Sequence, residues 1–147
     1  TRMIAQQRVA GALHEFISGV NLARSEAVRR GVRVTLCSAA SAGVCRTGAG
    51  TTWPSGWIVF VDDGATPGVI DAGEEVLRDR SAWVGMSSVV GTPAAIRSLS
   101  YVANGQLENP FALGQLSFTP QGGLSADMRY VCINRTGRPR VDELPCS

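Results

Sequence analysis

The fold is decided by residues 1–30, TRMIAQQRVAGALHEFISGVNLARSEAVRR, and by the change of pattern that follows them. In this stretch apolar side chains recur at steps of three and four, which places them on one face of a helix. These residues are Val9, Leu13, Phe16, Val20, Ala23 and Ala27. Gly31 is a natural residue to end such a helix, and Arg29 and Arg30 suit the negative end of its dipole. The sequence therefore predicts one long amphipathic helix.

Two glycines, Gly11 and Gly19, lie inside this predicted helix. Each weakens a helix by about 1 kcal/mol relative to alanine, because glycine loses more backbone freedom when it is ordered. Each also permits another surface to approach the helix closely. Both positions therefore favour contact with another subunit on the helix face opposite the sheet.

After Gly31 the apolar period changes from helical to two, the spacing of a strand. Residues 33–37 (RVTLC) predict one strand, and residues 56–62 (GWIVFVD), which are apolar on both faces, predict a central one. Further strands are expected at 75–78, 97–103, 115–119 and 129–134. Residues 38–55 and 63–75 predict loops. One helix followed only by strands favours an α+β fold, with the long N-terminal helix packed against antiparallel sheet.

Composition indicates a folded protein of one domain, because 44% of the 147 residues are hydrophobic and 18% are charged. The net charge of +2 hides an uneven distribution, since residues 1–50 carry seven Arg and two Glu whereas residues 51–110 carry three Arg and seven acids. The chain begins at Thr1 and has no apolar run of membrane-spanning length. We therefore expect a processed piece from which any membrane segment has been left out.

Four cysteines lie at 37, 45, 132 and 146, two early and two late in the chain. The even count and the local clustering favour the disulfides Cys37–Cys45 and Cys132–Cys146, although three connectivities are possible. Disulfides indicate an oxidising compartment such as the periplasm. No Cys-x-x-Cys pair is present, so a zinc site is not expected.

The residues indicate no enzyme, no metal and no cofactor. The single histidine, His14, lies on the predicted helix, and no nucleophile elbow or phosphate loop is present. A calcium loop starting at Asp63 would place Asp71 and Glu74 at ligand positions, but Ala65 and Pro67 would leave two positions without a side-chain oxygen. A solvated acidic turn is the better interpretation. The aromatic residues Trp53, Trp57 and Phe60 are expected in the core, with partner contact as an alternative for Trp53.

Four segments, in this order and spacing, resemble the minor pilin and pseudopilin family of FimT, FimU and GspH. They are residues 23–28 (ARSEAV), 56–62 (GWIVFVD), 71–78 (DAGEEVLR) and 134–140 (NRTGRPR). The first looks like the family's helix ending, the second like its first core strand, the third like its acidic loop and following strand, and the fourth like its C-terminal turn. The resemblance implies a structural subunit without catalytic activity.

The resemblance also implies how the chain is organised and where it works. Residues 1–31 would be the C-terminal half of the pilin helix, and residues 32–147 a β-rich globular head that forms one domain with it. The full-length chain would be anchored in the inner membrane by a missing N-terminal segment, with a periplasmic head, and would become extracellular in the pilus. Its partners would be major and minor pilins that contact the helix face opposite the sheet. Membership of a type IV pilus or of a type II secretion system stays open, with the pilus favoured.

The C-terminal turn carries the candidate binding site. Gly137 can adopt a positive φ, and Pro139 biases Arg138 to an extended conformation, so Arg138 and Arg140 would project to one side about 6–7 Å apart. Two such cations fit adjacent phosphates of a nucleic-acid strand, with Arg135 nearby. In FimT-like members a Gly-Arg-x-Arg pattern is associated with DNA binding during uptake in natural transformation. The alternative is that these arginines pair with Asp142 and Glu143 or are merely solvated.

Overall fold

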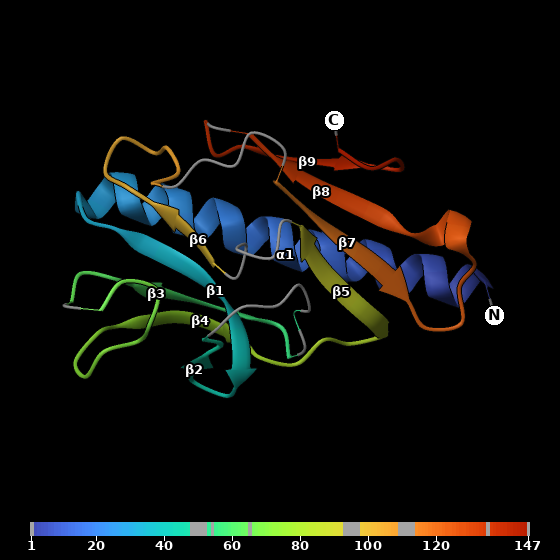
Figure 1. Cartoon of the computed structure of the whole chain (residues 1–147), viewed down its shortest axis with the longest axis horizontal. Coiled ribbons are helices and arrows are strands. Elements are labelled where there is room, and N and C mark those ends of the chain that lie inside the picture. The colour runs from blue at the N-terminus through green and yellow to red at the C-terminus, as the bar shows by residue number, and fades with distance from the viewer. Residues whose placement is uncertain are drawn as a thin grey trace.

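The structure, a computed structural model, describes residues 2–47, 53, 55–64, 66–92, 98–108, 114–134 and 136–146. In this part of the chain one long helix packs against two antiparallel sheets. Figure 1 shows the helix running the length of the molecule. None of the helices among these residues is long and apolar enough to cross a membrane.

Helix α1 (Arg2–Arg30) confirms the predicted helix. All six residues of the predicted apolar stripe are buried, and none is more than 7% exposed. The backbone N–H of Gly31 donates to the carbonyl of Ala27 at 2.9 Å, and Gly31 has a φ of +69°. The helix therefore ends where the sequence predicts, at a residue free to adopt the left-handed conformation.

The first sheet has the order β2-β1-β3-β4, and β6 pairs with β1. Its strands are β1 (Val34–Ser41), β2 (Val44–Cys45), β3 (Trp57–Val61), β4 (Val76–Arg80) and β6 (Ser98–Tyr101). Every residue of β3 is buried. Trp57 and Val59 belong to the core under α1, whereas Ile58 and Phe60 join a smaller cluster on the other face. This two-sided burial explains why the strand is apolar on both faces.

The second sheet has the order β5-β7-β8-β9. Its strands are β5 (Met86–Thr92), β7 (Gly114–Pro120), β8 (Arg129–Ile133) and β9 (Pro139–Asp142), and a short 3₁₀ helix, η1 (Ser125–Asp127), precedes β8. Leu116 and Phe118 of β7 and Val131 of β8 are buried against α1. The side chain of Gln6 on α1 donates to Asp127 at 3.1 Å. The second sheet thus covers the N-terminal half of the helix.

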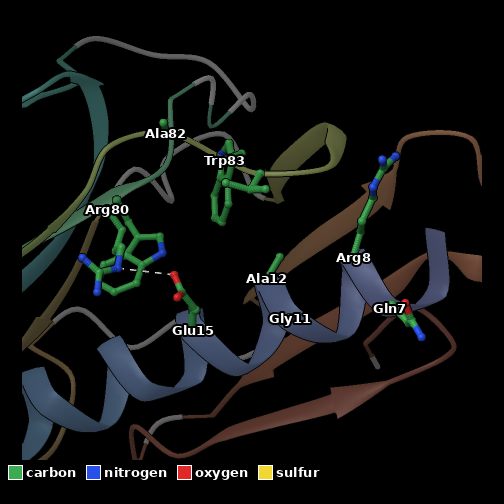
Figure 2. Close-up of a pocket in the computed structure, with 10 residues that line it drawn as sticks. Gln7, Arg8, Gly11, Ala12, Glu15, Arg80, Ala82 and Trp83 are labelled. Atoms are coloured by element: carbon green, nitrogen blue, oxygen red, sulfur yellow. Dashed lines mark ion pairs between the residues drawn. The ribbon is translucent and has the colours of Figure 1, made fainter. Parts of the chain in front are cut away.

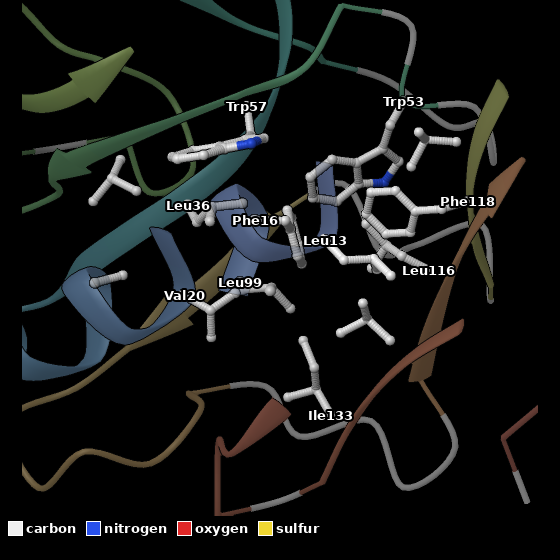
Figure 3. Close-up of a cluster of buried hydrophobic side chains, with 14 of the residues drawn as sticks. Leu13, Phe16, Val20, Leu36, Trp53, Trp57, Leu99, Leu116, Phe118 and Ile133 are labelled. Carbon is white, nitrogen blue, oxygen red and sulfur yellow. The ribbon is translucent and has the colours of Figure 1, made fainter. Parts of the chain in front are cut away.

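Phe16 of α1 lies where the two sheets meet (Figure 3). Its ring centroid is 6.3 Å from that of Trp57 in the first sheet and 5.6 Å from that of Phe118 in the second. The ring centroid of Trp53 lies 6.0 Å from that of Phe16, in an edge-to-face arrangement, and Trp53 is fully buried. Edge-to-face pairs add about 0.5–1.5 kcal/mol to the stability that burial supplies. The core prediction for Trp53, Trp57 and Phe60 is confirmed, and Trp53 is not available to a partner.

Two parts of the predicted secondary structure are wrong. The loop predicted over 38–55 begins too early, because β1 continues to Ser41 and β2 returns beside it after a turn at Gly43. Ser38 and Ala39 are fully buried there, yet small residues give no apolar alternation to detect. The other predicted strands appear with ends shifted by at most two residues where they are described, but β5 and β9 are not predicted. β5 is rich in small residues, and β9 begins with Pro139, which is tolerated at the start of an edge strand.

Candidate assembly surface and C-terminal arginine turn

A groove runs beside the outward face of α1 (Figure 2). Its floor is formed by small residues, Gly11 and Ala12, and its far wall by the segment from Arg80 to Val84, with a volume of about 320 Å³. Apart from the adjacent helix backbone, no atom of the described residues lies within 4 Å of the position that a Cβ on Gly11 would occupy. Val84 at the rim is 81% exposed. The groove therefore offers a close approach to the helix backbone beside exposed apolar surface.

The two glycines of α1 serve different purposes, which corrects part of the expectation. A Cβ on Gly19 would lie 2.6 Å from two ring atoms of Trp57, whose side chain is buried inside the same domain. Gly19 therefore allows β3 to approach α1. Of the two positions, Gly11 alone leaves the helix backbone open to a neighbour.

The groove continues along α1 past an ion pair. The Nε of Arg80 lies 3.4 Å from Oε2 of Glu15, as drawn in Figure 2. Beyond it a second hollow of about 230 Å³ adjoins, lined in part by His14 and Ser18. Arg78 donates to the Ser18 hydroxyl at 2.9 Å. β4 is the edge strand of its sheet. Arg78 pairs with Val59 and Arg80 with Trp57, so the two arginine side chains lie on the helix-facing side of the sheet. They therefore extend beside α1 and form the wall of the groove.

At the C-terminal turn, Gly137 has a structural reason to be glycine. It has a φ of +86°, and a Cβ would lie 2.5 Å from the ring of Tyr101. The hydroxyl of the buried Tyr101 donates to the Gly137 carbonyl at 2.7 Å. Position 137 is therefore fixed by packing against β6, which positions the start of β9.

The arginines of this turn differ in their partners. Arg138 is exposed and has no ion pair or hydrogen bond to another described residue. Arg140 is exposed and lies in register with Cys132, with its Nε 3.9 Å from Oδ2 of Asp142. Arg129 lies 3.4 Å from Glu143. The predicted pairing with acidic neighbours thus occurs weakly for Arg140 and not for Arg138 among these residues, and Arg135 lies outside the described residues.

Disulfides join Cys37 to Cys45 and Cys132 to Cys146. The first links β1 to β2. The second fixes the C-terminal tail to β8, and the backbone N–H of Cys146 donates to Gln115 of β7 at 2.8 Å. The tail is thereby held against the second sheet, beside Arg140.

The acidic loop uses its carboxylates to order its own backbone. Glu74 accepts hydrogen bonds from the N–H groups of Gly64 at 2.7 Å and Asp71 at 2.6 Å, and Asp71 accepts one from Thr66 at 2.8 Å. In the parts of the chain described here, no group of three or more His, Cys, Asp or Glu side chains could hold a metal ion. These carboxylates therefore have a structural role within the turn.

Asp62, at the start of this loop, is fully buried. Its Oδ2 accepts hydrogen bonds from the Thr35 hydroxyl at 2.7 Å and from the Gly68 N–H at 2.8 Å, and lies 3.6 Å from the Nε of Arg33. Arg33 also binds Glu108 at 2.7 Å. Burial raises the pKa of Asp62 above its ordinary value, against the opposing effect of these donors.

Comparison with known proteins identifies the family. A family model described as type II transport protein GspH matches residues 12–137. The chain belongs to the GspH family. The match begins at Ala12 within α1 and ends at the turn residue Gly137, so it includes the whole first sheet and every strand of the second sheet except β9. The family resemblance inferred from four sequence segments is confirmed.

Two crystal structures of the type IV minor pilin FimU from Pseudomonas aeruginosa (strain PAO1) are similar to this chain. The structure in space group P65 has a TM-score of 0.65 and 20% identity, and the match covers 90% of this chain and 91% of that one. The structure in space group P21 has a TM-score of 0.65 and 21% identity, and the match covers 90% of this chain and 87% of that one. The pilin-like α+β fold is thereby confirmed. No match was found among curated proteins.

Membership of the GspH family gives the general function. The chain is a minor pilin or pseudopilin of a type IV pilus or a type II secretion system. The family consists of structural subunits that assemble with other pilins and are not known as enzymes. Pilins of this kind are typically anchored in the inner membrane before they enter the pilus.

Proposed function

We propose that this chain is a minor pilin of a type IV pilus that helps to initiate or cap pilus assembly. The observation that carries the proposal is the open face of α1 at Gly11, beside Trp83 and the exposed Val84. The inner face of the same helix is already filled by both sheets. An assembly subunit needs such a second, outward face to bind its neighbours.

The proposal includes the organisation and location of the subunit. Residues 1–31 are the C-terminal half of the pilin helix, and residues 32–147 form with it one β-rich head. The full-length chain is held in the inner membrane by a segment N-terminal to α1, with the head in the periplasm until the subunit enters the pilus. The disulfides support this location, because such bonds persist in oxidising compartments.

The test is a Gly11→Leu variant in the host strain. Leucine is a good helix former and Gly11 has open space, so the domain should stay folded while the side chain blocks close approach. We expect the variant to disappear from sheared pili, with an unchanged unfolding midpoint of the isolated domain. Asn21→Leu, an exposed position on α1 beyond the groove, is the matched control. Normal incorporation of the Gly11→Leu protein would refute the proposal.

The same variants separate a pilus from a secretion system. A type II secretion pseudopilin has the same fold, so the phenotype decides. Loss of surface pili and twitching motility with intact exoprotein secretion supports the pilus. Loss of secretion with normal pili would assign the chain to the secretion system instead.

A second candidate function is DNA binding by a minor pilin in DNA uptake. It is favoured by the exposure of both Arg138 and Arg140 and by the absence of an ion pair at Arg138 among the described residues. Gly137 holds the turn in a fixed conformation against Tyr101, so the two cations are presented by an ordered backbone. Such a site would bind phosphates regardless of base sequence.

A gel-shift titration of duplex DNA with Arg138→Gln/Arg140→Gln tests this candidate. Wild-type binding should be weak, with a log–log salt slope of about −2 to −4, and the double variant should lose most of it. Arg29→Gln/Arg30→Gln removes the same charge at the end of α1, where Glu26 already binds both arginines, and should bind like wild type. If the Arg138→Gln/Arg140→Gln variant bound duplex DNA as tightly as the wild type, this site would be ruled out.

A further inference from the structure

We propose that the groove between α1 and β4 binds a helix of a different subunit, one whose exposed face is small, apolar and acidic, rather than a second copy of this chain. This inference rests on the proposed function and names the partner of the same surface. It is carried by the shape of the groove and by the charges along it.

The shape fits a helix. The lining residues on α1 extend from Gln7 to Ser18, a distance of about 16 Å or three turns of helix. The floor at Gly11 and Ala12 is small, and small residues let two helices approach to the short end of the usual 8–10 Å axial distance. Trp83 and Val84 supply apolar surface along one wall. A partner helix would lay its own apolar stripe into this groove.

The charge of the groove selects the partner. Three arginines, Arg8, Arg78 and Arg80, line it against one carboxylate, Glu15. Only Arg80 has an ion pair with Glu15, whereas Arg78 binds the hydroxyl of Ser18. The groove therefore carries an excess of positive charge, which favours a neighbour with acidic residues flanking its apolar face.

Arg8 is held at the rim in a way that keeps its charge available. A Cβ on Gly85 would lie 2.6 Å from Cδ of Arg8, so the aliphatic stem of Arg8 packs over the glycine, which has a φ of +76°. Arg8 has no ion pair or hydrogen bond to another described residue. The packed stem leaves the guanidinium exposed and oriented for a partner carboxylate.

A second copy of this chain has the wrong charge. Residues 2–18, the N-terminal part of α1, carry Arg2 and Arg8 against Glu15, so two such helices would bring like charges together. Five of the twelve acidic residues of the chain lie in residues 62–75. Two of them, Asp71 and Glu74, accept hydrogen bonds from backbone N–H groups of that loop. Among the residues that the structure describes, the chain therefore offers its own groove no helix with an excess of acidic residues.

The experiment is an NMR titration of the isolated domain with two synthetic 18-residue helical peptides. Both carry the same Ala/Leu stripe, one flanked by Glu and the other by Lys. The Glu peptide should shift the resonances of Gly11, Ala12 and the Trp83 indole N–H, and the Lys peptide should bind at least tenfold more weakly. Arg8→Gln should weaken the affinity for the Glu peptide by about two- to fivefold, as expected for the loss of an exposed ion pair. Arg29→Gln, which changes the net charge equally outside the groove, should have no effect.

Three results would overturn the inference: no shift at these residues with the Glu peptide, equal binding of both peptides, or concentration-dependent shifts at Gly11 without peptide, which would indicate a second copy. The Gly11→Leu incorporation assay is independent of these outcomes. If that variant is excluded from pili while the Glu peptide fails to bind, the surface is right and the partner is wrong. If the variant is incorporated normally, the proposed function itself fails.

Discussion

Gly19 and Gly11 lie about two turns apart on α1 and face different surroundings. At Gly19 the ring of Trp57 occupies the space where a side chain would be, whereas at Gly11 the corresponding space is empty. The same residue type thus brings a strand onto the helix at one position and leaves room for another molecule at the other. The comparison shows that a glycine in a helix has no fixed meaning until the opposing surface is known.

The largest effect should come from Gly19→Ala. The added methyl group overlaps a buried indole ring, and overpacking of a core costs about 1–3 kcal/mol. The better helix propensity of alanine returns about 1 kcal/mol. We expect a net loss of up to about 2 kcal/mol in the free energy of unfolding, measured by urea denaturation with fluorescence. An unchanged or raised midpoint would show that Trp57 moves aside without cost.

The same substitution at Gly11 should have the opposite sign. Because no other part of the described structure contacts this position, Gly11→Ala gains the helix propensity of about 1 kcal/mol without a clash. The urea midpoint should rise, and the difference between the two alanine variants isolates the environment, since the chemical change is identical. A loss of stability at Gly11 would mean that the outward face is packed within the domain.

The charge of Asp62, at the far end of the first sheet, should affect stability only as a function of pH. Burial raises its pKa above the ordinary value of 3.8, so the folded state holds the proton more tightly than the unfolded state does. In the pH range between those two pKa values the wild type therefore gains stability as the pH falls. Above that range the ionised carboxylate carries the full cost of its burial.

Asp62→Asn removes this titration but keeps an oxygen that can accept from Thr35 and Gly68. Its stability relative to the wild type should be greatest near neutral pH and should decline as the pH falls toward 4, by about 1.4 kcal/mol for each unit of pKa difference. Unfolding curves at several pH values measure this, and Asp63→Asn, at an exposed neighbour, is the control. A pH dependence of the same slope in wild type and Asp62→Asn would contradict the prediction. Neither alanine variant should change the slope.

Much of the fold could be predicted because its signals are local. The stripe from Val9 to Ala27 and the stop at Gly31 follow from helix period and glycine conformation, and the β3 strand follows from an unbroken apolar run. β5 and β9 could not be predicted from local pattern, because β5 consists largely of small and polar residues and β9 begins with proline. Both strands form by pairing with another strand, β5 with β7 and β9 with β8. Hydrogen bonds to a partner strand, not an internal pattern, make these segments strands.

The candidate site divides in the same way. The sequence shows two glycines on the helix, two arginines flanking Pro139 and an excess of arginine in the first third of the chain. It gives no sign of the groove, because Arg80, Trp83 and Val84 meet α1 only after the first sheet has packed on the helix. It also hides the reason for Gly137, which lies in the ring and hydroxyl of Tyr101.

The sequence by itself determined the helix, its inner face, the central strand and the family, since helix period, apolar runs and short motifs can be read from neighbouring residues. Tertiary structure alone decided which glycine is closed and which is open. It also decided where the exposed Arg8 and Arg138, which have no ion pair with another described residue, lie on the surface, and that the carboxylates of the acidic loop bind the backbone of that loop. These features depend on contacts between residues far apart in the chain. Close packing fixes such contacts in space, and no local pattern encodes them.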